Sequence, residues 1–534
     1  MYTFFNAKGF IMNFRKYIIV IFLFSAQLFS FELFSSSLRS ELSISSQNRL
    51  DSYLAKGYEE YFIVKLNTLD FTFYDATLSF GDYAYSAQKS RYDGELWEGA
   101  FVGDRFSYVN FVINNEDVVG LITVDGRNFQ ILSLGSGYAL IVKTLPRTID
   151  NPIQGAPAIT AQAAIAGIDI SAAVATSNGS VLDVMVVYSD DALAANASIE
   201  SVITSAFAYT NQALANSGAL FRYRVVHKAN ITYDESTSSS MQTDLTRLTS
   251  TTDGIMDDVH TWRNTYGADL VQLWVENANG VGGLAYVNQT VSSASYAYAF
   301  SVVWQYNGSS TIAHELGHNM GLSHDRYVSN ISMDDYSDYE GYGFIDHLND
   351  VNSIMSYTNE CTALRGVACA TVPYFSNPNI IRNGVVFGKA GIADGVRRMN
   401  SNRVMMAQAR AATVDVNYTV DLSGSLAEES DKGITSCFIA TAAYGSYLSS
   451  EVQVLRDFRD DVLLEYSWGR KFVAWYYKTS PSIASTIASS DILKSLMRWL
   501  LTPIVYMIAY PFISILLTVL LMMFIVIKRR RLAL

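Results

Sequence analysis

The stretch 311-TIAHELGHNMGLSHDR-326 constrains the fold more than any other part of the chain, because it gathers three of the six histidines within eleven residues. An α-helix brings residues i and i+4 onto one face, so His314 and His318 can direct their imidazoles at one point. Gly321 permits the positive φ that ends a helix and turns the chain, which would return His324 to the same point. The stretch therefore predicts a helix, a glycine bend and three converging imidazoles.

Three neutral imidazole nitrogens match the ligand set of a catalytic zinc ion, which keeps a further position open for water. Glu315 lies beside the first histidine, where its carboxylate could take a proton from that water as the water attacks a carbonyl carbon. The alternatives are a structural zinc ion and a solvated polar helix. A structural ion would not need a glutamate at this offset, so the extended pattern HExxHxxGxxH favours a catalytic zinc site. An additional calcium ion is left open as an alternative, although no sequence pattern indicates one.

A short apolar segment, 353-SIMSY-357, follows downstream of the third histidine. Met355 would form an apolar floor beneath the ligands, which is close to the alternative of simple core packing. Tyr357 could offer its hydroxyl to the oxyanion of a tetrahedral intermediate, or it could be a merely buried tyrosine. The segment therefore predicts a tight turn beneath the metal.

Two other regions are distinguished by their hydrophobic periodicity. Residues 31–146 show period-two alternation, which indicates antiparallel strands, and they contain no histidine or cysteine that could bind zinc. Residues 147–180 are dominated by Ala, Ser, Thr and Gly and are interpreted as a linker. From residue 181 the pattern alternates between strand and helix, which is typical of a mainly parallel sheet with helices on its faces. The expected strands are 182–188, 220–227 and 269–276, and the expected helices are 198–218, 241–250 and 255–267.

Both ends of the chain carry apolar segments. Residues 1–30 place Lys8, Arg15 and Lys16 before an apolar run and predict a cleaved signal peptide, with an uncleaved anchor as the alternative. Residues 503–527 predict a transmembrane helix, with a buried core helix as the alternative. The basic tail 528–534 would stay in the cytoplasm. The sequence therefore predicts a single-pass protein of the cell envelope whose main domains are exported.

Charge and cysteine usage limit the function further. The formal net charge of −12 argues against nucleic-acid binding, because phosphate-binding domains need clustered Lys and Arg. Cys361 and Cys369 are expected to form a local disulfide in an oxidising compartment, and two buried thiols are the alternative. Cys437 has no such neighbour.

The run 314-HELGHNMGLSHD-325, together with 182-LDVMVVYSDDAL-193, 268-ADLVQLWVE-276 and 353-SIMSY-357, resembles the reprolysin-like (adamalysin-type) metzincins. Within them it is similar to the bacterial branch that includes the peptidyl-Asp metalloendopeptidases. The resemblance implies a zinc endopeptidase whose cleft runs under an edge strand. Gly283, Leu284 and Ala285 would begin that strand and pair with an extended substrate, and Asp325 would brace the fold after the turn.

The chain departs from this family pattern in two respects. Specificity for Asp would need a cationic pocket, for which Arg365, Arg382 and Arg397 are the candidates. Family pro-domains often block zinc with a cysteine thiolate, but residues 31–180 contain no cysteine, so latency must arise in another way, for example by occupation of the cleft.

The C-terminal segment 437–502 resembles the CFI-box domain of exported bacterial proteins. Cys437 opens this segment. It is interpreted as a buried thiol in a small helical hairpin, with thioether anchoring or sorting as the alternative.

The predicted fold class is therefore an α/β (α+β) metzincin catalytic domain with a mixed, mainly parallel sheet. A β-rich pro-domain precedes it, and a small helical domain and one transmembrane helix follow it. The predicted function is that of an exported, membrane-anchored zinc endopeptidase that acts on proteins or peptides. The alternative is a catalytically silent surface binding or adhesion protein with a vestigial catalytic domain. The predicted domains are the signal peptide 1–30, the pro-domain 31–146, the linker 147–180, the peptidase domain 181–415, the linker 416–436, the CFI-box-like domain 437–502, the transmembrane helix 503–527 and the tail 528–534.

Overall fold

The computed structural model describes residues 31–413 apart from 68–70, 72–74, 102–103, 105, 115–116, 145–152, 155–178, 290, 292, 307, 333–338, 348–349 and 383–384, and beyond them only 455, 493–494, 497–502 and 505. The expected signal peptide, the linker 416–436, Cys437 and the basic tail lie outside the described residues. So do most of the linker 147–180 and nearly all of the CFI-box-like domain and the transmembrane segment. The chain divides into two compact units, Met1–Ser425 and Leu426–Leu534, and all elements below belong to the first.

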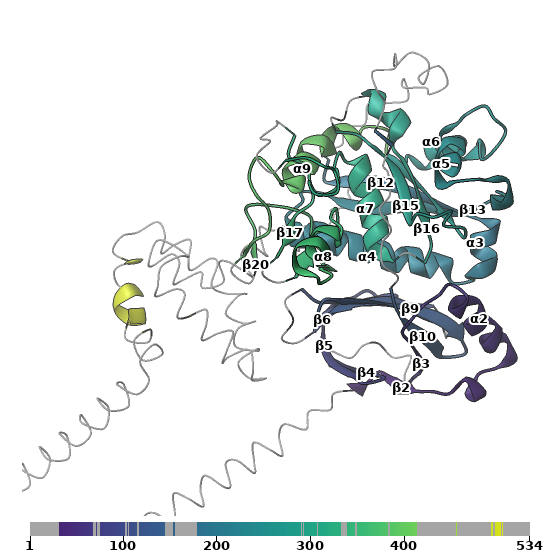
Figure 1. The fold of residues 1–534 in the computed structure, drawn as a ribbon, viewed down its shortest axis with the longest axis horizontal. Coiled ribbons are helices and arrows are strands. Elements are labelled where there is room, and N and C mark those ends of the chain that lie inside the picture. Colours follow the sequence, from purple (N-terminus) through teal and green to yellow (C-terminus); the bar gives the residue numbers. More distant parts are fainter. Residues whose placement is uncertain are drawn as a thin grey trace, which may run out of the picture. The chain divides into compact units, whose positions relative to one another are not determined.

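The N-terminal domain is built on a ten-stranded sheet with the order β1-β4-β5-β6-β7-β8-β9-β10-β3-β2 (Figure 1). All neighbouring strands are antiparallel except β1 and β4. The strands are β1 (Phe31–Glu32), β2 (Phe34–Ser36), β3 (Tyr61–Leu66), β4 (Asp75–Phe80), β5 (Tyr83–Tyr92), β6 (Leu96–Phe101), β7 (Tyr108–Asn114), β8 (Asp117–Val124), β9 (Arg127–Gly135) and β10 (Tyr138–Lys143). The helical segments are η1 (Arg39–Glu41) and α2 (Ile44–Leu54).

Alternation and turn chemistry explain this sheet. One face packs an aromatic core that includes Trp97, Phe111 and Phe129, and part of the other face packs beneath α2. Asp125 and Gly126 connect β8 to β9 with φ values of 49° and 69°, as a two-residue type I′ hairpin turn requires. Such turns join antiparallel neighbours, so local sequence directs each strand to pair with the next.

The second domain contains a six-stranded sheet with the order β11-β15-β16-β14-β12-β13. Strands β12, β13, β14 and β16 are parallel, β15 is antiparallel to β16, and β11 is parallel to β15. The strands are β11 (Ile153–Gln154), β12 (Val181–Ser189), β13 (Arg222–Ile231), β14 (Leu270–Val275), β15 (Gly283–Val287) and β16 (Phe300–Trp304). The helices are α3 (Asp190–Ala195), α4 (Ile199–Ser217), η2 (Glu235–Thr237), α5 (Met241–Thr249), α6 (Asp258–Tyr266), η3 (Ser293–Tyr298) and α7 (Ser309–Asn319).

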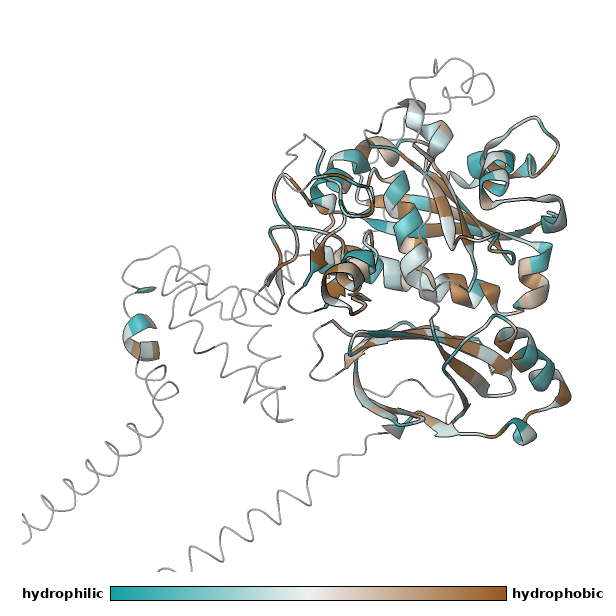
Figure 2. Ribbon diagram, viewed as in Figure 1, coloured by the Kyte–Doolittle hydropathy of each residue, from teal (hydrophilic) through white to brown (hydrophobic). Residues whose placement is uncertain are grey.

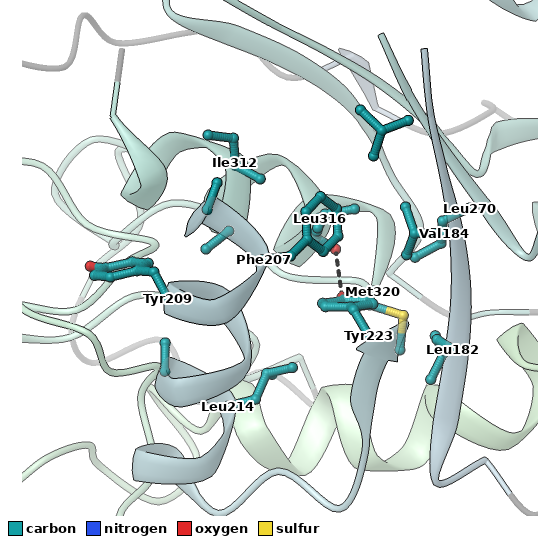
Figure 3. Packing of buried hydrophobic residues seen from close by; sticks show 14 of the residues in the cluster. Leu182, Val184, Phe207, Tyr209, Leu214, Tyr223, Leu270, Ile312, Leu316 and Met320 are labelled. Atoms are coloured by element: carbon teal, nitrogen blue, oxygen red, sulfur yellow. Dashed lines mark hydrogen bonds between the residues drawn. The ribbon is translucent and has the colours of Figure 1, made fainter. Parts of the chain in front are cut away.

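Each face of this sheet is covered by a different set of helices. Successive residues of a strand point to opposite faces, so one strand contributes to both hydrophobic clusters. Leu182 and Val184 of β12 belong to the hydrophobic cluster formed with α4 and α7 (Figure 3). Met185 and Val187 belong to the cluster formed with α5 and α6 on the other face. Strands β12 and β14 therefore carry apolar residues on both faces, and brown segments run through the strands of this sheet in Figure 2.

The chain after α7 adds two small sheets and two helices. The elements are β17 (Ile345–Asp346), β18 (Val351–Asn352), α8 (Asn359–Arg365), β19 (Ala370–Thr371), β20 (Ile381–Arg382), β21 (Val385–Val386) and α9 (Gly395–Met406). The predicted disulfide between Cys361 and Cys369 is present. It ties α8 to the segment that leads into β19.

The predicted fold class is wrong as a description of this chain. The largest sheet is the ten-stranded sheet of the N-terminal domain, which is almost entirely antiparallel, whereas the prediction gave prominence to a mainly parallel sheet. Within the described part of the chain no helix is both long and apolar enough to cross a bilayer. Of the transmembrane helix predicted at 503–527, only Val505 belongs to the described residues.

The N-terminal domain packs against α4 of the second domain. Asn110 of β7 is fully buried there. Its Nδ2 donates to the Ser205 carbonyl at 2.9 Å, and its Oδ1 accepts from Ser205 Oγ at 2.6 Å. The rings of Tyr108 and Tyr209 meet edge to face at 6.0 Å. Val112 and other outward residues of β7 and β8 join the same hydrophobic cluster as α4, so the two domains share one core.

Replacement of Asn110 by alanine tests the polar part of this contact. Asn110→Ala leaves Ser205 Oγ without its buried acceptor, so the free energy of unfolding should fall by about 1–3 kcal/mol in urea denaturation. Asn67→Ala is the matched control. Asn67 is exposed and donates to the Glu32 carbonyl at 2.9 Å, so this change should cost less than about 0.5 kcal/mol. Equal losses in the two variants would contradict the buried role of Asn110.

Candidate metal centre

Helix α7 carries the first two histidines within the protein interior. Every residue from Thr311 to Asn319 is buried. Ile312 and Leu316 pack into the cluster shared with α4 (Figure 3), and helical periodicity places residues 314 and 318 on the other side. The apolar stripe of α7 therefore fixes the direction in which both imidazoles project.

Gly321 turns the chain directly after α7. Its φ is 98°, a conformation that residues with a Cβ rarely adopt. A Cβ here would also lie 2.5 Å from Asn402 Nδ2 and 2.6 Å from the Asn288 carbonyl oxygen. The bend therefore needs glycine for its conformation and for the close approach of its neighbours, and it returns His324 to α7.

The structure brings the three predicted histidines together as a buried triad. The Nε2 atom of His318 lies 3.0 Å from Nε2 of His314 and 3.2 Å from Nε2 of His324. On their other sides, His314 Nδ1 lies 2.8 Å from the Ile354 carbonyl and His318 Nδ1 lies 2.8 Å from the Leu322 carbonyl. Because a carbonyl only accepts, both Nδ1 atoms donate a proton, and both Nε2 atoms turn lone pairs toward the centre of the triad.

This arrangement fits a divalent metal ion. Two nitrogens that bind zinc tetrahedrally at about 2.0–2.1 Å lie about 3.3 Å apart, close to the two separations within the triad. All three ligand atoms lie within 4.8 Å of one another. Lone pairs that face each other at such distances repel unless a cation lies between them, and neutral imidazoles suit zinc and other borderline metals.

The carboxylate of Glu315 lies against the first residue of β15. A Cβ on Gly283 would be 2.4 Å from Glu315 Oε1. The φ of Gly283 is not positive, so the need for glycine comes from the space that the carboxylate takes. Gly283, Leu284 and Ala285, the predicted edge-strand residues, are the first three residues of β15 and are buried. The structure thus brings the predicted base and the predicted substrate strand side by side.

The turn at Met355 lies under α7. A Cβ on Gly317 would meet Met355 Sδ at 2.6 Å, so the thioether packs directly against the backbone of the helix. The preceding residue, Ile354, supplies the carbonyl that accepts from His314. The turn therefore both supports the helix and orients a ligand.

Asp325 ties the third histidine to this turn. Its Oδ2 accepts the Tyr357 N–H at 2.9 Å, and its own N–H donates to the Met355 carbonyl at 3.1 Å. Burial raises the pKa of Asp325 above its ordinary value, and the N–H groups of Val328 and Tyr357 oppose that rise. The Tyr357 ring lies edge-on to His324 at 5.0 Å and is 3% exposed. Asp325 thus braces the bend and the turn together.

Two asparagines that sequence reasoning missed connect α7 to the sheet. Asn319 is fully buried, and its Nδ2 donates to the carbonyls of Tyr286 and Phe300, at 3.0 Å each. The Asn288 N–H donates to the His318 carbonyl at 3.1 Å. The only sequence signal was a polar residue directly after the second histidine, where an amphipathic helix would place an apolar one.

The spacing of the other three histidines matches no zinc motif, so the sequence predicts core or surface positions for them. His227, His260 and His347 lie on β13, on α6 and directly after β17, and the buried metal-binding group found among the described residues does not include them. Arg397 forms an ion pair with Glu340 and is 62% exposed. The side chains of the other two arginines suggested for a cationic pocket, Arg365 and Arg382, lie outside the described part of the structure.

The triad, its adjacent carboxylate and the methionine turn define the metal centre of a metallopeptidase. Residues 197–325 match the family model described as Metallo-peptidase family M12B Reprolysin-like. A peptidyl-Asp metalloendopeptidase of Stenotrophomonas maltophilia (strain R551-3) is 30% identical over 339 residues, which are 59% of this chain and 77% of that protein. The chain therefore belongs to the reprolysin-like M12B metallopeptidase family, and it is a metalloendopeptidase.

Further comparisons extend this result. A peptidyl-Asp metalloendopeptidase of Xanthomonas campestris pv. campestris is 28% identical over 303 residues, covering 56% of this chain and 69% of that protein. Among solved structures, metalloproteinase-II from Bacteroides fragilis covers 52% of this chain and 85% of its own at 12% identity. Its TM-score of 0.28 is too low to bear on the fold.

The contact between Gly283 and Glu315 yields a prediction. Gly283→Ala adds a methyl group where Oε1 now lies, so the carboxylate or β15 must move, and kcat should fall about 10- to 100-fold. Metal content should stay unchanged, because the substituted residue does not touch the triad. Ala285→Gly, which removes one carbon from the same strand, is the control and should change kcat much less. The measurements are peptide hydrolysis and metal per chain, and an unchanged kcat in Gly283→Ala would contradict the proposed crowding.

Proposed function

We propose that this protein is an exported zinc endopeptidase in which His314, His318 and His324 hold the ion and Glu315 acts as general base. One observation carries the proposal. The Nδ1 atoms of His314 and His318 are engaged by backbone carbonyls, while the Nε2 atoms face one another at 3.0 and 3.2 Å across the triad. Outer partners of this kind orient ligands for zinc before the ion arrives.

The chemistry requires little movement of the protein. When bound, zinc supplies a Lewis acid that lowers the pKa of a water molecule and polarises a carbonyl oxygen. Glu315, buried beside β15, accepts the proton of the attacking water and passes it to the amine that leaves. The edge of β15 orients an extended substrate by main-chain pairing. This pairing holds the scissile carbonyl of the substrate near Glu315 and near the three histidines.

Tyr357 is assigned the stabilisation of the oxyanion. Its ring lies edge-on to His324 at 5.0 Å and to His314 at 5.6 Å, so its side chain belongs to the wall of the metal centre. A hydroxyl that donates to an oxyanion contributes mainly to kcat, and this effect distinguishes it from a tyrosine that only packs.

Export is supported by the disulfide between Cys361 and Cys369. Such bonds form and persist in oxidising compartments. We therefore propose that the protein acts outside the cytoplasm.

The name of the relatives suggests the substrate. Because several of them are called peptidyl-Asp metalloendopeptidase, we propose bonds adjoining aspartate as the preferred cleavage sites. Recognition of a carboxylate requires a cationic or multiply donating pocket.

The Glu315→Gln variant tests the assignment of the base. The amide cannot take a proton, so kcat on casein should fall about 10²–10⁴-fold, while zinc remains near one ion per chain by elemental analysis. Glu360→Gln, the same change on α8, should leave kcat within about twofold. Both chains should be assayed as purified and after limited proteolysis. Bound zinc without hydrolysis by the unsubstituted chain under either condition would instead favour a silent binding protein.

Substrate preference can be tested with two isosteric peptides. A fluorogenic peptide with one aspartate should be cleaved with a kcat/KM about tenfold or more above that of the same peptide with asparagine. Mass spectrometry of the products locates the bond. Equal rates on both peptides, or cleavage remote from the substituted position, would reject the preference for aspartate.

A further inference from the structure

Strand β15 has an inner and an outer row of backbone groups. The Tyr286 carbonyl accepts from Asn319 Nδ2 at 3.0 Å, and the Gly282 carbonyl, just before the strand, accepts from the Trp304 N–H of β16 at 2.9 Å. The backbone N–H and C=O groups of successive residues in a strand point to opposite edges. Those of the even-numbered residues of β15 therefore point to β16. Gly283, Ala285 and Val287 therefore direct their N–H and C=O groups to the outer edge.

The outer edge is occupied by a segment of the chain itself. Strand β11 pairs with β15 in parallel, with Ile153 opposite Tyr286 and Gln154 opposite Val287. The backbone groups of Tyr286 point to β16, so they cannot pair with β11. In a parallel ladder of this register, the N–H of Ile153 instead donates to the Ala285 carbonyl, and the C=O of Ile153 accepts from the Val287 N–H. The backbone groups of Gln154 then point away from β15.

This is the edge that begins at the metal centre. Gly283, at the start of β15, touches the carboxylate of Glu315. The groups paired with β11 lie only two to four residues further, roughly 7–13 Å along the strand. An extended peptide that crosses the metal centre and pairs along β15 would need the same groups of Ala285 and Val287.

We propose that the outer edge of β15 is a docking surface for extended polypeptide and that the segment at Ile153–Gln154 occupies it in the uncut chain, in competition with substrate. The proposal rests on the proposed function, in which substrate pairs with β15. The segment lies between β10 and β12, whose domains are docked through α4, so it acts at high effective concentration. Residues 31–180 contain no cysteine, and backbone pairing needs none.

Peptide binding tests the docking surface without reference to catalysis. The probe is a fluorescein-labelled peptide of residues 149–158, IDNPIQGAPA, measured by anisotropy against the full chain carrying Glu315→Gln. Adding Ile153→Pro removes the N–H that faces β15, so the edge should open and the peptide should bind about tenfold or more tightly than to the parent. Gln154→Pro is the matched control, because its N–H points away, and it should bind like the parent. Ile153→Gly, which weakens an extended strand, should give a smaller shift in the same direction.

Hydrogen exchange gives a second readout. The Val287 amide should exchange about tenfold or more faster in Ile153→Pro than in the parent or in Gln154→Pro. Equal peptide affinity and equal Val287 exchange in the two proline variants would overturn the proposal.

A third readout concerns competition and uses chains with Glu315 intact. Ile153→Pro should raise kcat/KM on a fluorogenic peptide, whereas Gln154→Pro should not. The competition is also overturned if Ile153→Pro opens the edge of β15 but does not raise kcat/KM, provided that limited proteolysis activates the same chain. If no chain hydrolyses peptide even after limited proteolysis, the proposed function fails, and the affinities and exchange rates still decide whether the edge is occupied.

Discussion

The metal centre depends on the contact between α7 and the turn at Met355. The Ile354 carbonyl fixes the tautomer of His314, and the Met355 thioether reaches the helix because Gly317 has no side chain. The carboxylate of Asp325, the residue after His324, stabilises the same turn by accepting the Tyr357 N–H. A shift of the turn would therefore change ligand orientation, helix support and the third histidine together, which explains why so much buried polar structure is concentrated there.

The parts of this site that sequence could predict are the local ones. The spacing of His314 and His318 determines a shared helix face, and Gly321 determines a bend, whatever the rest of the chain does. Gly283 and Asn319 could not be assigned a role in this way, because each acts on a residue that is distant in the sequence and near only in the fold. The unexpected polar residue after His318 marks Asn319 as unusual, but neither it nor the neighbours of Gly283 indicate which distant residues are contacted.

The same distinction applies to the fold. Alternation predicted strands in residues 31–146, and the turn at Asp125 and Gly126 shows why neighbours pair in antiparallel fashion. The pairing of β3 with β10 and β2, which extends the sheet to ten strands, depends on long-range contacts. A prediction that took its fold class from the catalytic domain could not anticipate that this accessory sheet would be the larger one.

The core shared across α4 has a consequence for a chain that loses its first domain. Tyr209 and Ala206 are buried in a cluster to which Tyr108, Val112 and Leu121 of the N-terminal domain contribute. Without these residues, α4 would expose a hydrophobic patch to water, and such patches promote self-association. The liberated enzyme would thus tend to form dimers or to adhere to apolar surfaces, and its first domain would have served as a solubilising cover during folding.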